Sequence, residues 1–101
     1  MNKIQQDYIK MLDYLDELYY KTQDKEEKEK IGTYHKNLSV YLEDFLRAKF
    51  ANNNKFYKSA AYKLRKTKDA VRKHLETQSK IEVMFRYLSQ LLEQIDALLY
   101  G

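Results

Sequence analysis

Proline is absent from this chain and glycine occurs only twice in its 101 residues, which restricts the fold more than any other feature of the sequence. Sheet architectures depend on glycine, asparagine and proline at many tight turns, so their scarcity favours helices joined by few corners. Charged residues make up 34% of the chain and hydrophobic residues 44%, a mixture that suits helices with one apolar face. These features predict an all-α fold, and the length predicts a single domain over residues 1–101.

Apolar side chains recur at helical spacing in four segments, which predicts helices over about residues 2–21, 25–50, 55–76 and 80–100. In the first segment the apolar residues share one face and are Ile4, Tyr8, Met11, Leu15 and Leu18. In the last segment the corresponding residues are Ile81, Phe85, Leu88, Leu92, Ile95 and Leu99, widened by Met84, Leu91 and Leu98. Four such helices joined by short turns predict an antiparallel up-down-up-down four-helix bundle.

Two similar segments, TQDKEE at residues 22–27 and TQSKIE at residues 77–82, mark the first and last turns. In each segment Asp24 or Ser79 is expected to cap the following helix by accepting a hydrogen bond from a backbone N–H in its first turn. Asparagines at residues 52–54 form the middle turn, since asparagine can both end and begin helices. Gly32 marks either a kink in the second helix or the start of its packed part.

A long helical hairpin is the alternative architecture, with residues 2–50 packed against residues 55–100. The two capping segments argue against it, because each predicts a helix start inside one arm of the hairpin. The wide apolar stripes of the first and last helices would also remain partly exposed, so such a hairpin would have to dimerise.

The positive charge is concentrated in residues 55–74, KFYKSAAYKLRKTKDAVRKH, which contain eight Lys or Arg residues and one acid. On a helical wheel, Tyr57, Ala60, Leu64 and Val71 lie on the buried side. Lys68 falls at the edge of that side and is expected to extend outward to solvent. We call the residues of the opposite arc the basic face: Lys55, Lys58, Tyr62, Lys63, Arg65, Lys66, Arg72 and Lys73.

Three interpretations of the basic face are open. It can be a solvated helix surface, partly neutralised by acids of the first two helices, namely Asp13, Asp16, Glu17, Glu43 and Asp44. It can contact a protein partner or an anionic membrane surface. It can also bind nucleic acid, with cations along the phosphates and the exposed ring of Tyr62 stacked on a base.

The sequence contains no recognisable catalytic or metal-binding pattern. Cysteine is absent, and the two histidines, His35 and His74, lie on different predicted helices. A di-iron bundle needs an acid three residues before each histidine, but those positions hold Gly32 and Val71. No glycine-rich phosphate loop or nucleophile elbow is present. The sequence therefore predicts a protein that is not an enzyme, with no catalytic residue, cofactor, metal or small-molecule substrate.

The opening residues MNKIQQDYIK are too polar for a signal peptide, and no stretch approaches the roughly 18 apolar residues that would cross a membrane. The lack of cysteine fits a reducing compartment. We therefore expect a cytoplasmic protein, with association to a membrane surface as an added feature.

The size, the lysine-rich composition, the four amphipathic helices and the segment LDELYYK at residues 15–21 resemble the class IIa bacteriocin immunity proteins. The resemblance implies a bacterial four-helix bundle that protects a producer cell from its own peptide toxin. It also implies action inside the cell, near the membrane receptor that the toxin attacks. No residue of this chain receives a role through the resemblance. A small phage or mobile-element protein that binds a host factor is the other interaction protein that these features fit.

Overall fold

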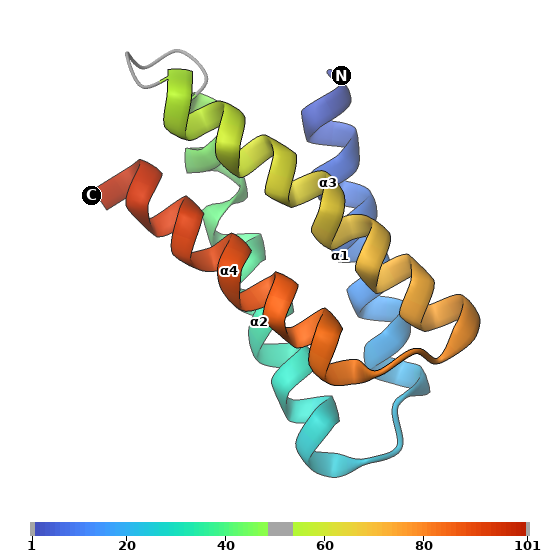
Figure 1. Ribbon diagram of the computed structural model, residues 1–101. Helices are drawn as coiled ribbons and strands as arrows, with labels where there is room; N and C mark the ends of the chain where they lie inside the picture. The colour runs from blue at the N-terminus through green and yellow to red at the C-terminus, as the bar shows by residue number, and fades with distance from the viewer. Residues whose placement is uncertain (1, 49–53, 101) are drawn as a thin grey trace.

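The computed structural model describes residues 2–48 and 54–100. Over these residues it contains four helices and no strand: α1 (Lys3–Lys21), α2 (Lys25–Arg47), α3 (Asn54–Thr77) and α4 (Ile81–Tyr100) (Figure 1). The all-α four-helix prediction is confirmed, and the helix boundaries follow the predicted ranges closely. The predicted end of the second helix at about residue 50, and the asparagines at 52 and 53, lie outside the described residues.

Figure 1 shows that the helices alternate in direction along the chain, as the up-down-up-down prediction requires. α1 packs against both α2 and α3, and α4 packs mainly against α3 and less extensively against α2. The fold is therefore two antiparallel hairpins, α1–α2 and α3–α4, laid against each other with α1 as the main neighbour of α3. The long helical hairpin is wrong, because the helices end at Lys21 and Thr77 and new helices begin at Lys25 and Ile81.

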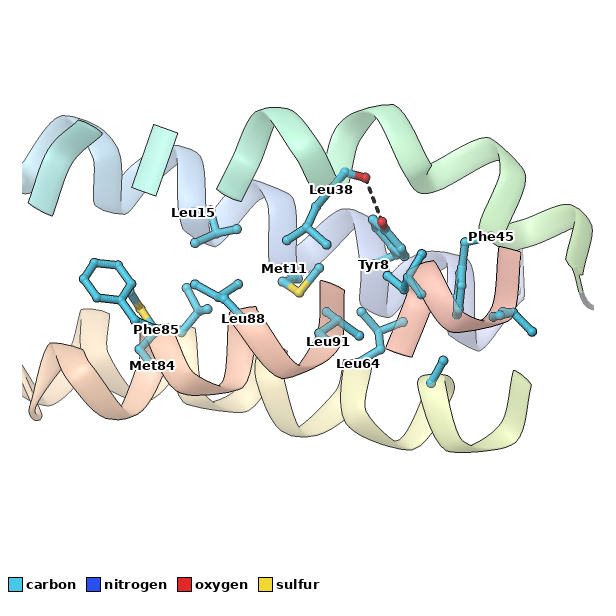
Figure 2. Close-up of a cluster of buried hydrophobic side chains, with 14 of the residues drawn as sticks. Tyr8, Met11, Leu15, Leu38, Phe45, Leu64, Met84, Phe85, Leu88 and Leu91 are labelled. Atoms are coloured by element: carbon cyan, nitrogen blue, oxygen red, sulfur yellow. Dashed lines mark hydrogen bonds between the residues drawn. The ribbon is translucent and has the colours of Figure 1, made fainter. Parts of the chain in front are cut away.

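The core lies between the two hairpins and takes fully buried side chains from all four helices (Figure 2). The apolar stripes predicted for the first and third helices are buried, apart from partly buried residues near their ends. In α4 the buried stripe differs from the predicted spine and consists of Met84, Phe85, Leu88, Leu91, Ile95 and Leu98. The stripe turns toward α3 because α4 packs more extensively on α3 than on α2.

An aromatic stack joins three helices at one end of the core. The Phe45 ring of α2 lies 5.5 Å from the Tyr8 ring of α1 and 5.3 Å from the Tyr57 ring of α3, between ring centres. The Tyr8 hydroxyl donates a hydrogen bond to the Leu38 carbonyl at 2.7 Å (Figure 2), and burial raises its pKa, so it stays protonated as a donor. The Tyr57 hydroxyl is also buried, but it has no hydrogen-bond partner among the described residues.

The two tyrosines give a matched pair of substitutions with different expected effects. Tyr8→Phe should reduce the free energy of unfolding by about 1 kcal/mol, because it removes a buried hydrogen bond. Tyr57→Phe should be neutral or slightly stabilising, because it removes a buried hydroxyl that has no partner among the described residues. Urea denaturation of both variants checks the prediction, and an equal loss in the two would contradict it.

Helix starts follow the predicted capping chemistry in the first hairpin only. Oδ1 of Asn2 accepts a hydrogen bond from the Gln5 N–H at 2.7 Å, and Oδ1 of Asp24 accepts one from the Glu27 N–H at 2.9 Å. The predicted cap at Ser79 is wrong, because α4 begins at Ile81 and Ser79 lies one residue too early. The segments at residues 22–27 and 77–82 therefore differ in backbone conformation, although they share residue types at several positions.

Gln78 ends α3 in the left-handed region, with φ of 52° and its N–H bonded to the His74 carbonyl at 2.8 Å. A side chain in this conformation costs about 1 kcal/mol that glycine avoids. Gln78→Gly should therefore raise the melting temperature by about 4–8 °C. Gln23→Gly in the turn between α1 and α2 is the control, since Gln23 does not have a positive φ and its replacement should not raise the melting temperature. Calorimetry that shows the same shift for both variants would contradict the prediction.

Gly32 does not begin the packed part of α2, because the helix runs through it from Lys25 and Ile31 before it is already fully buried. A Cβ at Gly32 would lie 3.1 Å from Cε2 of Tyr19, so the glycine allows the Tyr19 ring to pack closely on α2. The Lys28 ammonium lies 4.7 Å from the centre of that ring. The Lys28 contact ties the charged first turns of α2, residues 25–30, to α1.

Candidate interaction surface

Seven of the eight residues of the basic face are exposed along the outer side of α3. The reason is local: Ala60, Leu64 and Val71 are fully buried at helical spacing, which places most cations of the basic face on the opposite side of the helix. The helix spans 24 residues, and the cations occur along most of its length. The basic face is therefore a long strip rather than a cluster at one end.

Lys63 is the member of the basic face that the structure places differently. Its side chain turns toward α4, where Nζ donates a hydrogen bond to Oε1 of Gln90 at 2.9 Å and lies 5.3 Å from the centre of the Tyr87 ring. The wheel prediction is wrong here because it treats α3 alone, whereas α4 supplies an acceptor and an aromatic ring. Lys63 therefore links the two helices of the second hairpin.

Tyr62 lies in the middle of the basic face, and its side chain is exposed as predicted, with 56% of its surface accessible. The Lys66 ammonium lies 5.5 Å from the centre of the Tyr62 ring, a cation–π contact on the same helix. The exposed Tyr62 ring is therefore already in contact with one cation of the basic face, Lys66.

The acids of α1 and α2 do not neutralise the basic face. In the described residues, none of the five expected acids forms an ion pair with it: Asp13, Asp16, Glu17, Glu43 and Asp44. Glu17 instead pairs with Lys21 at 3.2 Å, and the two acids near the end of α2 pair with Arg47. The acid that does contact the strip is Asp69 of α3, at 3.5 Å from Arg72.

One cation of α3 points inward. Nζ of Lys68 lies 3.0 Å from Oδ1 of Asp7 on α1, and the exposed fractions of the two side chains are 14% and 2%. The expectation that Lys68 extends to solvent is wrong, because a buried carboxylate within reach offers a charge-assisted hydrogen bond. Asp7 has no predicted role in the sequence, although its spacing from Ile4 and Met11 places a charge on the apolar face of α1.

A groove of about 480 Å³ lies between α3 and α4 beside the basic face. Its apolar lining residues are Ala70, Val83, Met84 and Tyr87. Its charged lining residues are Lys66, Asp69, Lys73 and Lys80. Two of these lysines belong to the basic face, so the strip and the groove form one surface. Sequence patterns do not reveal the groove, because its two walls come from different helices.

A second groove has a mostly acidic lining. A groove of about 680 Å³ between α2 and α4 is lined by carboxylates and aromatic rings, including Glu26, Glu27, Glu29, Glu82, Tyr34 and Phe85. The Lys30 ammonium lies 4.8 Å from the centre of the Phe85 ring, so a cation of the chain itself already occupies this aromatic surface. The acidic lining of this groove contrasts with the basic face along α3.

Both histidines lie in the walls of shallow hollows. Nδ1 of His74 lies 2.5 Å from the Ser79 carbonyl, which accepts the hydrogen bond and so places the proton on Nδ1. His35 lines a small hollow with Asp16, Tyr19 and Gly32. Across residues 2–48 and 54–100, no group of three or more His, Cys, Asp or Glu side chains is arranged to hold a metal ion.

No helix in the described part of the chain combines the length and the apolar character needed to cross a membrane. Comparison of the chain with protein-family models, with curated proteins and with solved structures finds no match.

Proposed function

We propose that this chain is a non-enzymatic, cytoplasmic interaction protein whose basic face docks on an acidic surface of a partner protein. The observation that carries the proposal is the exposed positive charge of α3, which in the described residues is met by an acid of its own helix and by none from α1 or α2. A strip of this kind steers association and sets the register of a complex.

Two features favour a protein over nucleic acid as the partner. Asp69 lies within the strip with about half of its side chain exposed, and a phosphate backbone running along α3 would bring negative charge against it. Val83 in the adjoining groove is 42% exposed, and phosphates offer nothing apolar to cover it. A protein surface can place a polar group at Asp69 and an apolar side chain at Val83.

Charge reversal tests the docking role. The triple variant Arg65→Glu, Lys66→Glu and Arg72→Glu should weaken binding of labelled polyglutamate by at least about tenfold in fluorescence anisotropy. Its melting temperature should change little, because the three side chains are exposed.

The control carries the same change in net charge at exposed cations elsewhere, Lys10→Glu, Lys36→Glu and Arg86→Glu, and should retain binding. Equal loss in both variants would show that net charge alone matters and would contradict the proposal. Tighter binding to oligodeoxythymidylate with a steep salt dependence would assign the strip to nucleic acid. Preferential binding to phosphatidylglycerol vesicles would assign it to a membrane surface.

The most specific form of the proposal is bacteriocin immunity, which the resemblance of the sequence implies. A sensitive strain that expresses the chain should survive challenge with class IIa bacteriocins, and the Arg65, Lys66 and Arg72 variant should lose that protection. The Lys10, Lys36 and Arg86 control should still protect. Absence of protection by the unmodified chain across a broad panel would contradict the immunity role and leave the docking role in place.

A further inference from the structure

The three lysines at the edge of the groove between α3 and α4 are available to a partner. Lys66, Lys73 and Lys80 are exposed, and none of them forms an ion pair within the described residues. Asp69 also lines the groove, but its carboxylate is held by Arg72 at 3.5 Å. Lys66 and Lys73 are seven residues apart on one helix, which separates them by about 10.5 Å along its axis.

The groove also has an apolar part, formed by Ala70, Val83, Met84 and Tyr87. Val83 and Tyr87 are one helical turn apart on α4, and the small side chain of Ala70 on α3 leaves the space between the helices open. Val83 is 42% exposed, although α4 is otherwise the most apolar helix of the bundle. An uncovered apolar side chain between unpaired cations is complementary to an apolar side chain flanked by carboxylates.

We infer that this groove receives an apolar side chain from an acidic helix of the partner, and this inference rests on the docking role proposed above. Two carboxylates seven residues apart on that helix match the separation of Lys66 and Lys73. A leucine or phenylalanine three or four residues after the first carboxylate faces the same side and enters the groove beside Val83. The groove thus favours partner helices with this sequence pattern, whereas the rest of the basic face distinguishes partners only by their charge.

Two labelled helical peptides test this inference. Both carry glutamates seven residues apart, and they differ in one position between the glutamates, which is leucine in one peptide and alanine in the other. The unmodified protein should bind the leucine peptide about tenfold more tightly, since burial of a leucine side chain is worth at least that ratio. In nuclear magnetic resonance spectra the amides of Ala70, Val83 and Tyr87 should shift more with the leucine peptide.

Val83→Ser should remove the preference for leucine and leave binding of the alanine peptide unchanged. Val40→Ser is the matched control, because Val40 is an exposed valine on α2 outside the groove, and it should keep the preference. Equal binding of both peptides by the unmodified protein would overturn the groove inference while the docking role stands. If neither peptide binds even at low salt, the docking role and the inference both fail.

Discussion

Phe45→Ala should reduce the free energy of unfolding by about 4 kcal/mol, one of the two largest effects that we expect from a single substitution. Phe45 is fully buried and its ring contacts both Tyr8 and Tyr57, so its removal opens a cavity where three helices meet. Small domains have a total stability of about 5–15 kcal/mol, and a loss of this size should lower the melting temperature by about 15–30 °C. Thermal and urea denaturation followed by circular dichroism measure it.

The matched control for Phe45 is Phe56→Ala on α3. The Phe56 side chain is 52% exposed, so its truncation should cost less than about 1 kcal/mol. If the two substitutions destabilised the protein equally, the aromatic stack could not be the point at which α1, α2 and α3 are held together.

Lys68→Met should reduce the free energy of unfolding by about 3–5 kcal/mol, because it leaves the buried Asp7 carboxylate without its close partner. Oδ2 of Asp7 already has no hydrogen-bond partner among the described residues, and the Lys3 ammonium is 3.9 Å from Oδ1 and mostly exposed. The Lys3 ammonium therefore cannot replace Lys68 as the partner of the Asp7 carboxylate. The measurement is urea denaturation at neutral pH.

Two further variants distinguish a buried ion pair from a general requirement for lysine. Lys21→Met breaks the exposed pair with Glu17 and should cost at most about 0.5 kcal/mol. The double variant Asp7→Leu and Lys68→Met removes both charges and should recover most of the loss, since an apolar pair avoids the cost of burying charge. A double variant as unstable as Lys68→Met alone would contradict this account.

The position of the Asp7–Lys68 pair has a consequence for the basic face. The pair joins α1 to α3, the two helices through which the hairpins mainly pack on each other. If α3 shifted along α1, each charge would lie in the apolar interior without its partner, which costs free energy. The pair therefore favours one register of α3 on α1, which in turn orients the cations on the far side of α3. We expect the Lys68→Met variant to bind polyglutamate less tightly under conditions in which it is partly unfolded.

Much of the fold could be predicted from the sequence. Scarce glycine, absent proline and apolar residues at spacings of three and four determine four amphipathic helices, because helix periodicity is a local property of the backbone. The same spacing on α3 places Leu64 and Val71 inside and Arg65, Lys66 and Arg72 outside, as the structure shows. The cap at Asp24 is equally local and was also predicted correctly.

Only the tertiary structure decided which helices are neighbours, and the departures at Lys63 and Lys68 follow from that. Lys63 turns to Gln90 and Tyr87, and Lys68 turns to Asp7, because partners on α4 and α1 compete with solvent for each ammonium group. The two TQ-containing turns share their letters but differ in backbone, with the second tied by the hydrogen bond between His74 and Ser79. The groove that joins the basic face to Val83 exists because α3 and α4 are packed side by side. Contacts between residues far apart in sequence carry free energies as large as local preferences, and no local pattern encodes them.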